Sequence, residues 1–439
     1  MQLWQKIKQI YQSKPRARRL SQEEIDRIYP KLRLQMLEAT FVGYAAYYLV
    51  RTNLPNAVPA MQKTLGYSQQ EMGLILSATG LAYGIGKFLL GGLSDRANPG
   101  MLMPTGLLLT AVLNILFGTA NHFGIHLFLW TLNGFVQGVG WGPCGRTLGH
   151  WFSVSERGKI FGIWNIAHNV GGGLAGLIAG YSAEHLGFRS AFYIPALLAT
   201  ISAFYLFTRL KDKPESLGLP PIEEYRHDYP EKQVPHEELS FREIFLNRVL
   251  LNPYVWLISL ANFFVYVIRY SLLDWGPTYL VQEHGATLSR GGWTTFFYEI
   301  AAIPSTIFIG FASDKLGGRR GLVSILSLLP ILIAFLILVY TPPKELWGQI
   351  LLFGTVGLFI YPPVMLLGVA ALDFSSAKAV GAAAGFIGLW GYLGKAAQAT
   401  ALAYLSSHYG WKIALSVVAL SVLAAVVLLL PVARKRPQN

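Results

Sequence analysis

Hydrophobic stretches of about 20 residues recur along the whole chain and set its organisation. A helix of roughly 20 apolar residues is long enough to cross the hydrocarbon core of a bilayer. The pattern therefore predicts twelve membrane-spanning helices, and one long polar stretch follows the sixth. The predicted helices cover 36–58, 70–93, 101–120, 124–149, 157–181, 188–208, 253–281, 291–312, 321–340, 346–371, 378–404 and 409–432.

The polar stretch 209–252 is rich in Pro, Lys, Arg and Glu, which indicates a linker between two six-helix bundles. Within it, ELSFREIFLNR (238–248) has the amphipathic spacing of a helix that lies on a membrane surface. The predicted domains are an N-terminal segment 1–35, a first bundle 36–208, the linker 209–252, a second bundle 253–432 and a tail 433–439.

The composition agrees with the predicted membrane helices and excludes a soluble protein class. Hydrophobic residues make up 53% of the chain and charged residues only 13%, whereas a soluble domain carries about 25% charged residues. The fold class is therefore an all-α polytopic membrane protein. Its 45 glycines and 23 prolines fit close helix packing and broken helices in lipid. The lone Cys144 excludes an intrachain disulfide and a thiolate metal cluster, and it is expected to be a small packed residue.

The positive charges predict the orientation. Placing both termini in the cytoplasm puts most of the 36 lysines and arginines on that side, as the positive-inside rule requires. The net charge of +13 therefore reflects topology and contact with anionic lipid. The cluster KPRARR (14–19) resembles a nucleic-acid-binding tail, but its place before the first membrane helix favours a cytoplasmic anchor. We expect no nucleic-acid partner and no cleavable signal peptide.

Two arginines lie inside predicted membrane helices, at matching places in the two halves. Arg51 lies in GYAAYYLVRTN and Arg269 in NFFVYVIRYS. A buried guanidinium in mid-membrane costs roughly 2.5–3.5 kcal/mol unless it faces a wet cavity or a partner. Because arginine binds phosphate through a rigid fork of donors, the symmetry predicts one central phosphate site between the halves. The alternative is that each arginine pairs with a carboxylate, for which Asp274 and Glu299 are available.

A loop motif repeats at nearly the same offset. GGLSD, ending at Asp95, recurs as GFASD, ending at Asp314, and the second copy continues as KLGGRRG. This pattern resembles the loop between helices two and three in the major facilitator superfamily. An aspartate there caps a helix or pairs with cytoplasmic cations, which latches the halves in one state. The resemblance implies two pseudo-symmetric six-helix bundles with a site at their interface near the midplane.

Longer motifs narrow the resemblance to the organophosphate:phosphate antiporters, and within them to the bacterial glycerol-3-phosphate transporters. The resemblance implies exchange of glycerol 3-phosphate for inorganic phosphate by alternating access, without ATP, in the bacterial inner membrane. The motifs are GWGPCGRTLGHWFSVSERGKIFGIWNIAHNVGGG (140–173), GLPPIEEYRHDYP (218–230), YVIRYSLLDWGPTYL (266–280), FFYEIAAIPSTIFIGFASDK (296–315) and GFIGLWGYLG (385–394).

The same resemblance assigns candidate site residues. It places His168 at the phosphate site, where its charge can respond to an arriving anion, although a lone histidine on an apolar helix is usually a packed core residue. Asn165 and Trp164 are expected to shape the surroundings of the site. The candidate cavity-lining tyrosines, which membrane interfaces also favour, are Tyr44, Tyr48, Tyr266, Tyr361 and Tyr392.

Charged residues near the site are expected to change partners during transport. Lys87 on the second helix, Asp274 on the seventh and Glu299 on the eighth resemble family residues that form salt bridges. Asp95 and Asp314 are expected to act with them as gating residues at the cytoplasmic side.

The chain departs from the family pattern at two positions. The family usually has Arg-Lys-Asn after the tyrosines of helix one, whereas Arg51 is followed here by Thr52. Conversely, Lys395 adds a cation where the glycerol-3-phosphate transporters have glycine. Since Lys395 lies three residues after Tyr392, we expect it to face the same cavity and favour substrates with a second negative group, such as phosphoglycerate. The alternatives are that Lys395 offsets the missing cation or extends to a helix end.

Other functional classes find little support in the sequence. It has no nucleophile–base motif, no HExxH and no Walker lysine, so we expect no enzyme activity, no cofactor and no metal. A membrane sensor of a sugar phosphate is the rival interpretation, because it would keep the same binding residues. Antiporters for hexose phosphate or phosphoglycerate are further alternatives. We expect the protein to be a monomer whose partners are small organophosphates, inorganic phosphate and membrane lipid.

Overall fold

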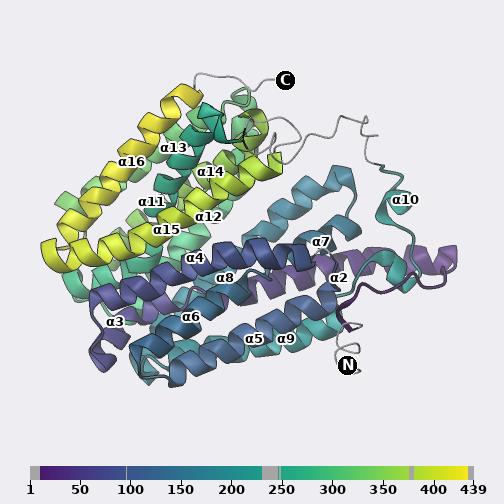
Figure 1. The fold of residues 1–439 in the computed structure, drawn as a ribbon, viewed down its shortest axis with the longest axis horizontal. Coiled ribbons are helices and arrows are strands. Elements are labelled where there is room, and N and C mark those ends of the chain that lie inside the picture. The colour runs from purple at the N-terminus through teal and green to yellow at the C-terminus, as the bar shows by residue number, and fades with distance from the viewer. Residues whose placement is uncertain (1–9, 95, 230–245, 247–248, 375–379, 434–439) are drawn as a thin grey trace.

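The structure is a computed structural model that describes residues 10–94, 96–229, 246, 249–374 and 380–433. Within this part of the chain the helices form two bundles, which Figure 1 shows packed against each other. The first bundle contains α2 (Gln22–Leu49), α3 (Leu54–Leu65), α4 (Gln69–Ser94), α5 (Pro99–Thr119), α6 (Phe123–Gln137), α7 (Trp141–Trp151), α8 (Val154–Leu186) and α9 (Ser190–Arg209).

A connecting region with the short helices η1 (Pro214–Leu217) and α10 (Ile222–Arg226) follows the first bundle. The second bundle contains α11 (Pro253–His284), α12 (Leu288–Lys315), α13 (Arg320–Tyr340), α14 (Leu346–Phe374), α15 (Val380–Tyr409) and α16 (Trp411–Ala433). The expected all-α fold class is confirmed.

Local sequence explains where many of these helices begin and end. Asn98 and Asn252 stand just before α5 and α11, and each side chain accepts backbone N–H bonds from the first turn. Gly66 ends α3 and Gly285 ends α11 with φ of 70° and 60°, a left-handed conformation that favours glycine. These signals fix the element ends that the apolar pattern alone leaves uncertain.

Seven helices in the described part of the chain are long and apolar enough to cross a membrane on their own: α4, α5, α9, α11, α13, α14 and α16. The remaining expected spans fall on helices with more polar or glycine residues. In α8, for example, His168 and three consecutive glycines replace apolar side chains. Buried polar side chains occur on both kinds of helix, since Arg269 and Asp274 lie on α11 and His168 lies on α8.

Two of the expected spans are not single helices. The first breaks at residues 50–53, between α2 and α3, and the fourth breaks at 138–140, between α6 and α7. A Cβ at Gly138 would lie 2.3 Å from the backbone carbon of Gly86, so α6 and α4 approach too closely for any larger residue there. Such close contacts and backbone breaks come from tertiary packing, which hydrophobic periodicity does not report.

The two bundles contact each other along α8 with α12 and along α4 with α15. At one end the contact is tight, because Gln69 Nε2 donates to Ser406 Oγ (3.1 Å) and Ser289 N–H donates to Glu184 Oε2 (2.7 Å). Toward the opposite end, where the N-terminal residues lie, the bundles diverge (Figure 1). We call these the far end and the linker end. The structure is therefore closed at the far end.

The first part of the expected linker packs on the first bundle. Asp212 is only 4% exposed and accepts hydrogen bonds from Ser13 Oγ (2.7 Å), Lys14 N–H (2.8 Å) and Arg146 Nη2 (3.3 Å). The N-terminal segment and the linker thus fasten each other to α7. The amphipathic segment expected at 238–248 lies outside the described residues except for residue 246.

We expect Asp212→Asn to loosen this attachment. The buried carboxylate serves three donors, and losing charged hydrogen bonds of this kind costs about 1–3 kcal/mol. The melting temperature in detergent should fall, and trypsin should cleave after Arg16 and Arg18 faster than in the wild type. Asp228→Asn is the matched control, because Asp228 holds Ser155 through an exposed contact. Equal melting temperatures and cleavage rates in both variants would contradict the structural role of Asp212.

Candidate functional site

One cavity between the two bundles is lined by every residue proposed from the sequence to bind substrate. Lys87 and the residues Tyr83, Trp141, Tyr270, Val364 and Met365 complete its wall. The lining comes from both halves of the chain, as a site between two bundles requires. The candidate residues that meet there are Arg51, Arg269, His168, Asn165, Tyr44, Tyr48, Tyr266, Tyr361 and Tyr392.

Arg51 lies at the break between α2 and α3. Its Nη2 donates to Tyr48 Oη at 2.7 Å, and its guanidinium lies over the rings of Tyr48 (4.1 Å) and Tyr83 (4.2 Å). Aromatic faces attract a cation without neutralising it. No carboxylate among the described residues lies within ion-pair distance of Arg51. The guanidinium therefore remains available to an anion.

Arg269 lies within the unbroken helix α11 and is only 6% exposed. Its Nη2 donates to Tyr361 Oη (2.8 Å), and Tyr361 in turn donates to Glu299 Oε2 (2.7 Å). Glu299, an alternative partner for the arginines, is thus linked to Arg269 indirectly, through the hydroxyl of Tyr361. Among the described residues, Nε of Arg269 has no hydrogen-bond partner. A buried guanidinium donor without a partner is costly, which favours an anion at this position.

Glu299 also connects the two bundles. Besides Tyr361, it accepts a hydrogen bond from Asn169 Nδ2 (2.8 Å) on α8. The chain Arg269–Tyr361–Glu299–Asn169 therefore runs from the arginine of the second bundle into the first. An anion that draws Arg269 away from Tyr361 would alter a contact between the two halves.

His168 stands between tyrosines of the two bundles. Its ring centroid is 5.5 Å from that of Tyr48 and 5.5 Å from that of Tyr361. Nδ1 donates to the carbonyl of Asn165, which leaves Nε2 as the remaining polar atom of the ring. Close packing brings this helix to α2, since a Cβ at Gly171 would lie 2.3 Å from the carbonyl oxygen of Ala45.

The other candidate tyrosines form two groups. The ring centroid of Tyr44 is 5.5 Å from that of Tyr48 and 4.7 Å from that of Trp164. The indole N–H of Trp164 donates to a backbone carbonyl, as expected for a packing residue. On the opposite side, Tyr266 and Tyr392 lie edge to face at 5.8 Å. The cavity is therefore walled by hydroxyl-bearing rings on both halves.

Lys87, Asp274 and Glu299, which were expected to form salt bridges, form no ion pair with another described side chain. Lys87 Nζ lies 5.3 Å from the ring centroid of Trp141, and Asp274 accepts a hydrogen bond from Gln398 (2.7 Å). Asp95 and the side chain of Asp314 lie outside the described residues.

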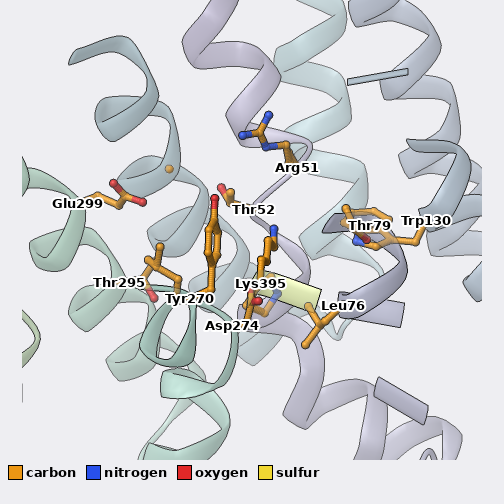
Figure 2. A pocket seen from close by; sticks show the side chains of 13 residues that line it. Arg51, Thr52, Leu76, Thr79, Trp130, Tyr270, Asp274, Thr295, Glu299 and Lys395 are labelled. Atoms are coloured by element: carbon orange, nitrogen blue, oxygen red, sulfur yellow. The ribbon is translucent and has the colours of Figure 1, made fainter. Parts of the chain in front are cut away.

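Lys395 is not among the residues that line the main cavity. It lines a second compartment with Asp274, Thr52 and Glu299, and this compartment shares Arg51 and Tyr270 with the main cavity. Figure 2 shows Tyr270 between Glu299 and Lys395. The Lys395 Nζ is 4.2 Å from the Tyr270 ring centroid. Tyr392 and Lys395 both face α4, since a Cβ at Gly84 would lie 3.4 Å from Tyr392 Cδ2 and a Cβ at Gly80 would lie 3.2 Å from Lys395 Cδ. The two side chains therefore share a helix face and are separated along it by about one turn.

Sequence reasoning missed several residues of the site. Tyr83 and Tyr270 contact the two arginines, and Asn169 and Gln398 hold the two acidic side chains. Tyr83 lies one helical turn before Lys87, and Tyr270 directly follows Arg269, so both were within reach of a helical argument. The amides gave no such signal, because their roles depend on helices far apart in sequence.

Comparison with known proteins agrees with this geometry. Residues 40–399 match the family model of the Major Facilitator Superfamily. The chain is 41% identical over 411 residues to a glycerol-3-phosphate transporter of Bacillus subtilis, covering 92% of each protein. It is 36% identical over 411 residues to the membrane sensor protein UhpC of Escherichia coli, covering 93% of this chain and 94% of the sensor. Neither relative is an enzyme.

Solved structures support the same fold. A bacterial homolog of the human lysosomal transporter Spinster, solved in an inward-facing and unoccupied conformation, superposes with a TM-score of 0.72. Sequence identity is 15%, and the match covers 92% of this chain and 97% of the other, so it speaks for the fold alone. Fold, family model and close relatives coincide, and the chain is a multi-pass membrane protein that belongs to the major facilitator superfamily.

Proposed function

We propose that this protein exchanges glycerol 3-phosphate for inorganic phosphate by alternating access. The observation that carries the proposal is the single cavity into which both bundles direct an arginine without a direct carboxylate partner among the described residues. The similarity of this protein to a glycerol-3-phosphate transporter, over 92% of the chain, supports the choice of substrate.

The chemistry of the cavity suits a phosphate group. Such a group carries between one and two negative charges near neutral pH and offers several acceptor oxygens. Arg51 and Arg269 keep their charge when buried and bind through several donors, while His168 and the tyrosine hydroxyls supply further hydrogen bonds. The anion would join residues of the two bundles, and its transfer would follow as the bundles rock about it.

We further propose that the protein resides in a bacterial inner membrane with both termini in the cytoplasm. The distribution of positive charge supports this orientation. The linker end then faces the cytoplasm and the tight contacts of the far end face outward. In this conformation the cavity would receive its substrate from the cytoplasm.

A membrane sensor is the second candidate, because the UhpC sensor is 36% identical over nearly its whole length. Counterflow separates the two functions. Liposomes that contain only this protein and are loaded with phosphate should take up labelled phosphate from outside. Binding of phosphate without any counterflow would contradict transport and favour the sensor.

We also propose that Lys395 influences substrate choice, from the compartment that adjoins Arg51. If it does, Lys395→Gly should lower the preference for 3-phosphoglycerate over glycerol 3-phosphate, because the second negative group loses its cation. The measurement is inhibition of phosphate exchange by each compound. Lys412→Gly is the control, since Lys412 also lies over a tyrosine ring, at 5.3 Å, but outside both compartments. An unchanged ratio of inhibition constants in Lys395→Gly would rule out this role.

A further inference from the structure

The helix break that carries Arg51 is held by side chains from two other helices. The carbonyl of Val50 accepts one hydrogen bond from Asn114 Nδ2 (2.9 Å) on α5 and another from Asn133 Nδ2 (3.1 Å) on α6. One turn earlier, the carbonyl of Tyr47 accepts from Gln137 Nε2 (3.2 Å) on α6. Asn114, Asn133 and Gln137 are at most 1% exposed.

The chain that follows Arg51 is hydrogen-bonded to the same buried amides. Asn53 Nδ2 donates to Asn114 Oδ1 (2.9 Å) and to the carbonyl of Ala191 (2.9 Å) on α9. Asn114 therefore contacts the chain both before and after Arg51. A broken helix inside a membrane leaves backbone groups that water does not satisfy, and buried amides supply the missing donors.

The matching arginine of the second bundle has no such arrangement. Arg269 lies inside continuous α11, and its backbone carbonyl accepts a hydrogen bond from Tyr298 Oη (3.0 Å). The two arginines match in sequence but differ in how their backbones are held. Among the described residues, amide side chains bond to the backbone beside Arg51, whereas hydroxyl groups bond to the backbone beside Arg269.

We infer that Asn114 and Asn133 are positioning residues for Arg51. They fix the conformation of residues 50–53, and through it they aim the guanidinium into the phosphate cavity. The N–H groups of Arg51 and Thr52 turn back to the Tyr48 carbonyl, and no backbone N–H of the described residues donates to the Val50 carbonyl. The two amides supply the donors of that carbonyl and so stabilise this conformation. The inference rests on the proposed function, in which Arg51 binds the phosphate group.

A double-mutant cycle tests the inference. Asn114→Leu keeps the approximate shape and removes the hydrogen bonds. We expect it to raise the Kd for inorganic phosphate, measured by calorimetry on purified protein, roughly tenfold, or ~1.4 kcal/mol. It should do the same in an Arg269→Ala background. In an Arg51→Ala background it should have no further effect, because the group that it positions is gone.

Two variants keep the test decisive. If Asn114→Leu fails to fold, Asn133→Ala takes its place in the cycle. It leaves the Val50 carbonyl with one amide donor, so it should give the same pattern with a smaller rise in Kd. Asn262→Leu is the control, since Asn262 is also buried and donates to a carbonyl, that of Ile387, away from Arg51. Its effect should be equal in both backgrounds.

An Asn114 effect of equal size in the Arg51→Ala and Arg269→Ala backgrounds would overturn the inference and show a general structural role. If neither arginine substitution changes the Kd, the phosphate site itself is wrong, which is a different failure.

Discussion

Arg269→Lys is expected to weaken binding of phosphate and of glycerol 3-phosphate together, by about ten- to a hundredfold. Lysine keeps the positive charge but loses the fork of donors. In the structure Nη2 of Arg269 already serves Tyr361, while Nε stays without a partner among the described residues. The single ammonium of lysine does not donate both to Tyr361 and in the direction of Nε. Each charged hydrogen bond that is lost is worth about 1.5–3 kcal/mol. Arg51→Lys should act in the same direction.

The measurement is the Kd of each ligand for purified protein, accompanied by exchange activity at matched expression. Arg189→Lys is the control, because Arg189 contacts Gly118 and Asn121 near the far end and does not line the cavity. Near-normal binding in either the Arg51 or the Arg269 variant would rule out the clamp. A loss for only one of the two ligands would contradict a shared phosphate site.

Transport is expected to require an anion on both sides of the membrane. Two arginines that keep their protons leave the empty cavity strongly cationic in an interior of low dielectric. A bound phosphate group neutralises this charge, and it also joins residues of the two bundles. The occupied protein should therefore change between its two conformations far more readily than the empty one.

Liposomes test this requirement directly. Those loaded with inorganic phosphate should accumulate external labelled glycerol 3-phosphate, and empty ones should take up almost none. Arg269→Lys liposomes serve as the control for leakage. Equal initial uptake into loaded and empty liposomes would contradict exchange and indicate a uniporter or a proton symporter.

The broad fold follows from the sequence because apolar length is a strong signal in membrane proteins. The pattern alone does not reveal that the span around Arg51 is broken, since residues 36–58 are apolar enough to suggest one helix. The break depends on Asn114 and Asn133, which lie 61 and 83 residues from Asn53 and Val50, respectively. Such long-range amide contacts leave no local periodicity to read.

The candidate site was predictable to a large extent, for two different reasons. The duplicated arginines came from symmetry and the cost of burying charge, whereas His168 and the tyrosines came from family resemblance. The expectation for Lys395 shows the limit of helical spacing. Tyr392 and Lys395 do share a face toward α4, but three residues separate them by about 4.5 Å along the helix axis, so Lys395 lines the adjoining compartment instead of the main cavity.

The most direct test of the central claim is an experimental structure of the protein with glycerol 3-phosphate bound. The account predicts density for the phosphate group between the two bundles, within hydrogen-bond distance of the guanidiniums of both Arg51 and Arg269. A phosphate held by one arginine alone, or one bound beside Lys395 and away from Arg269, would contradict it.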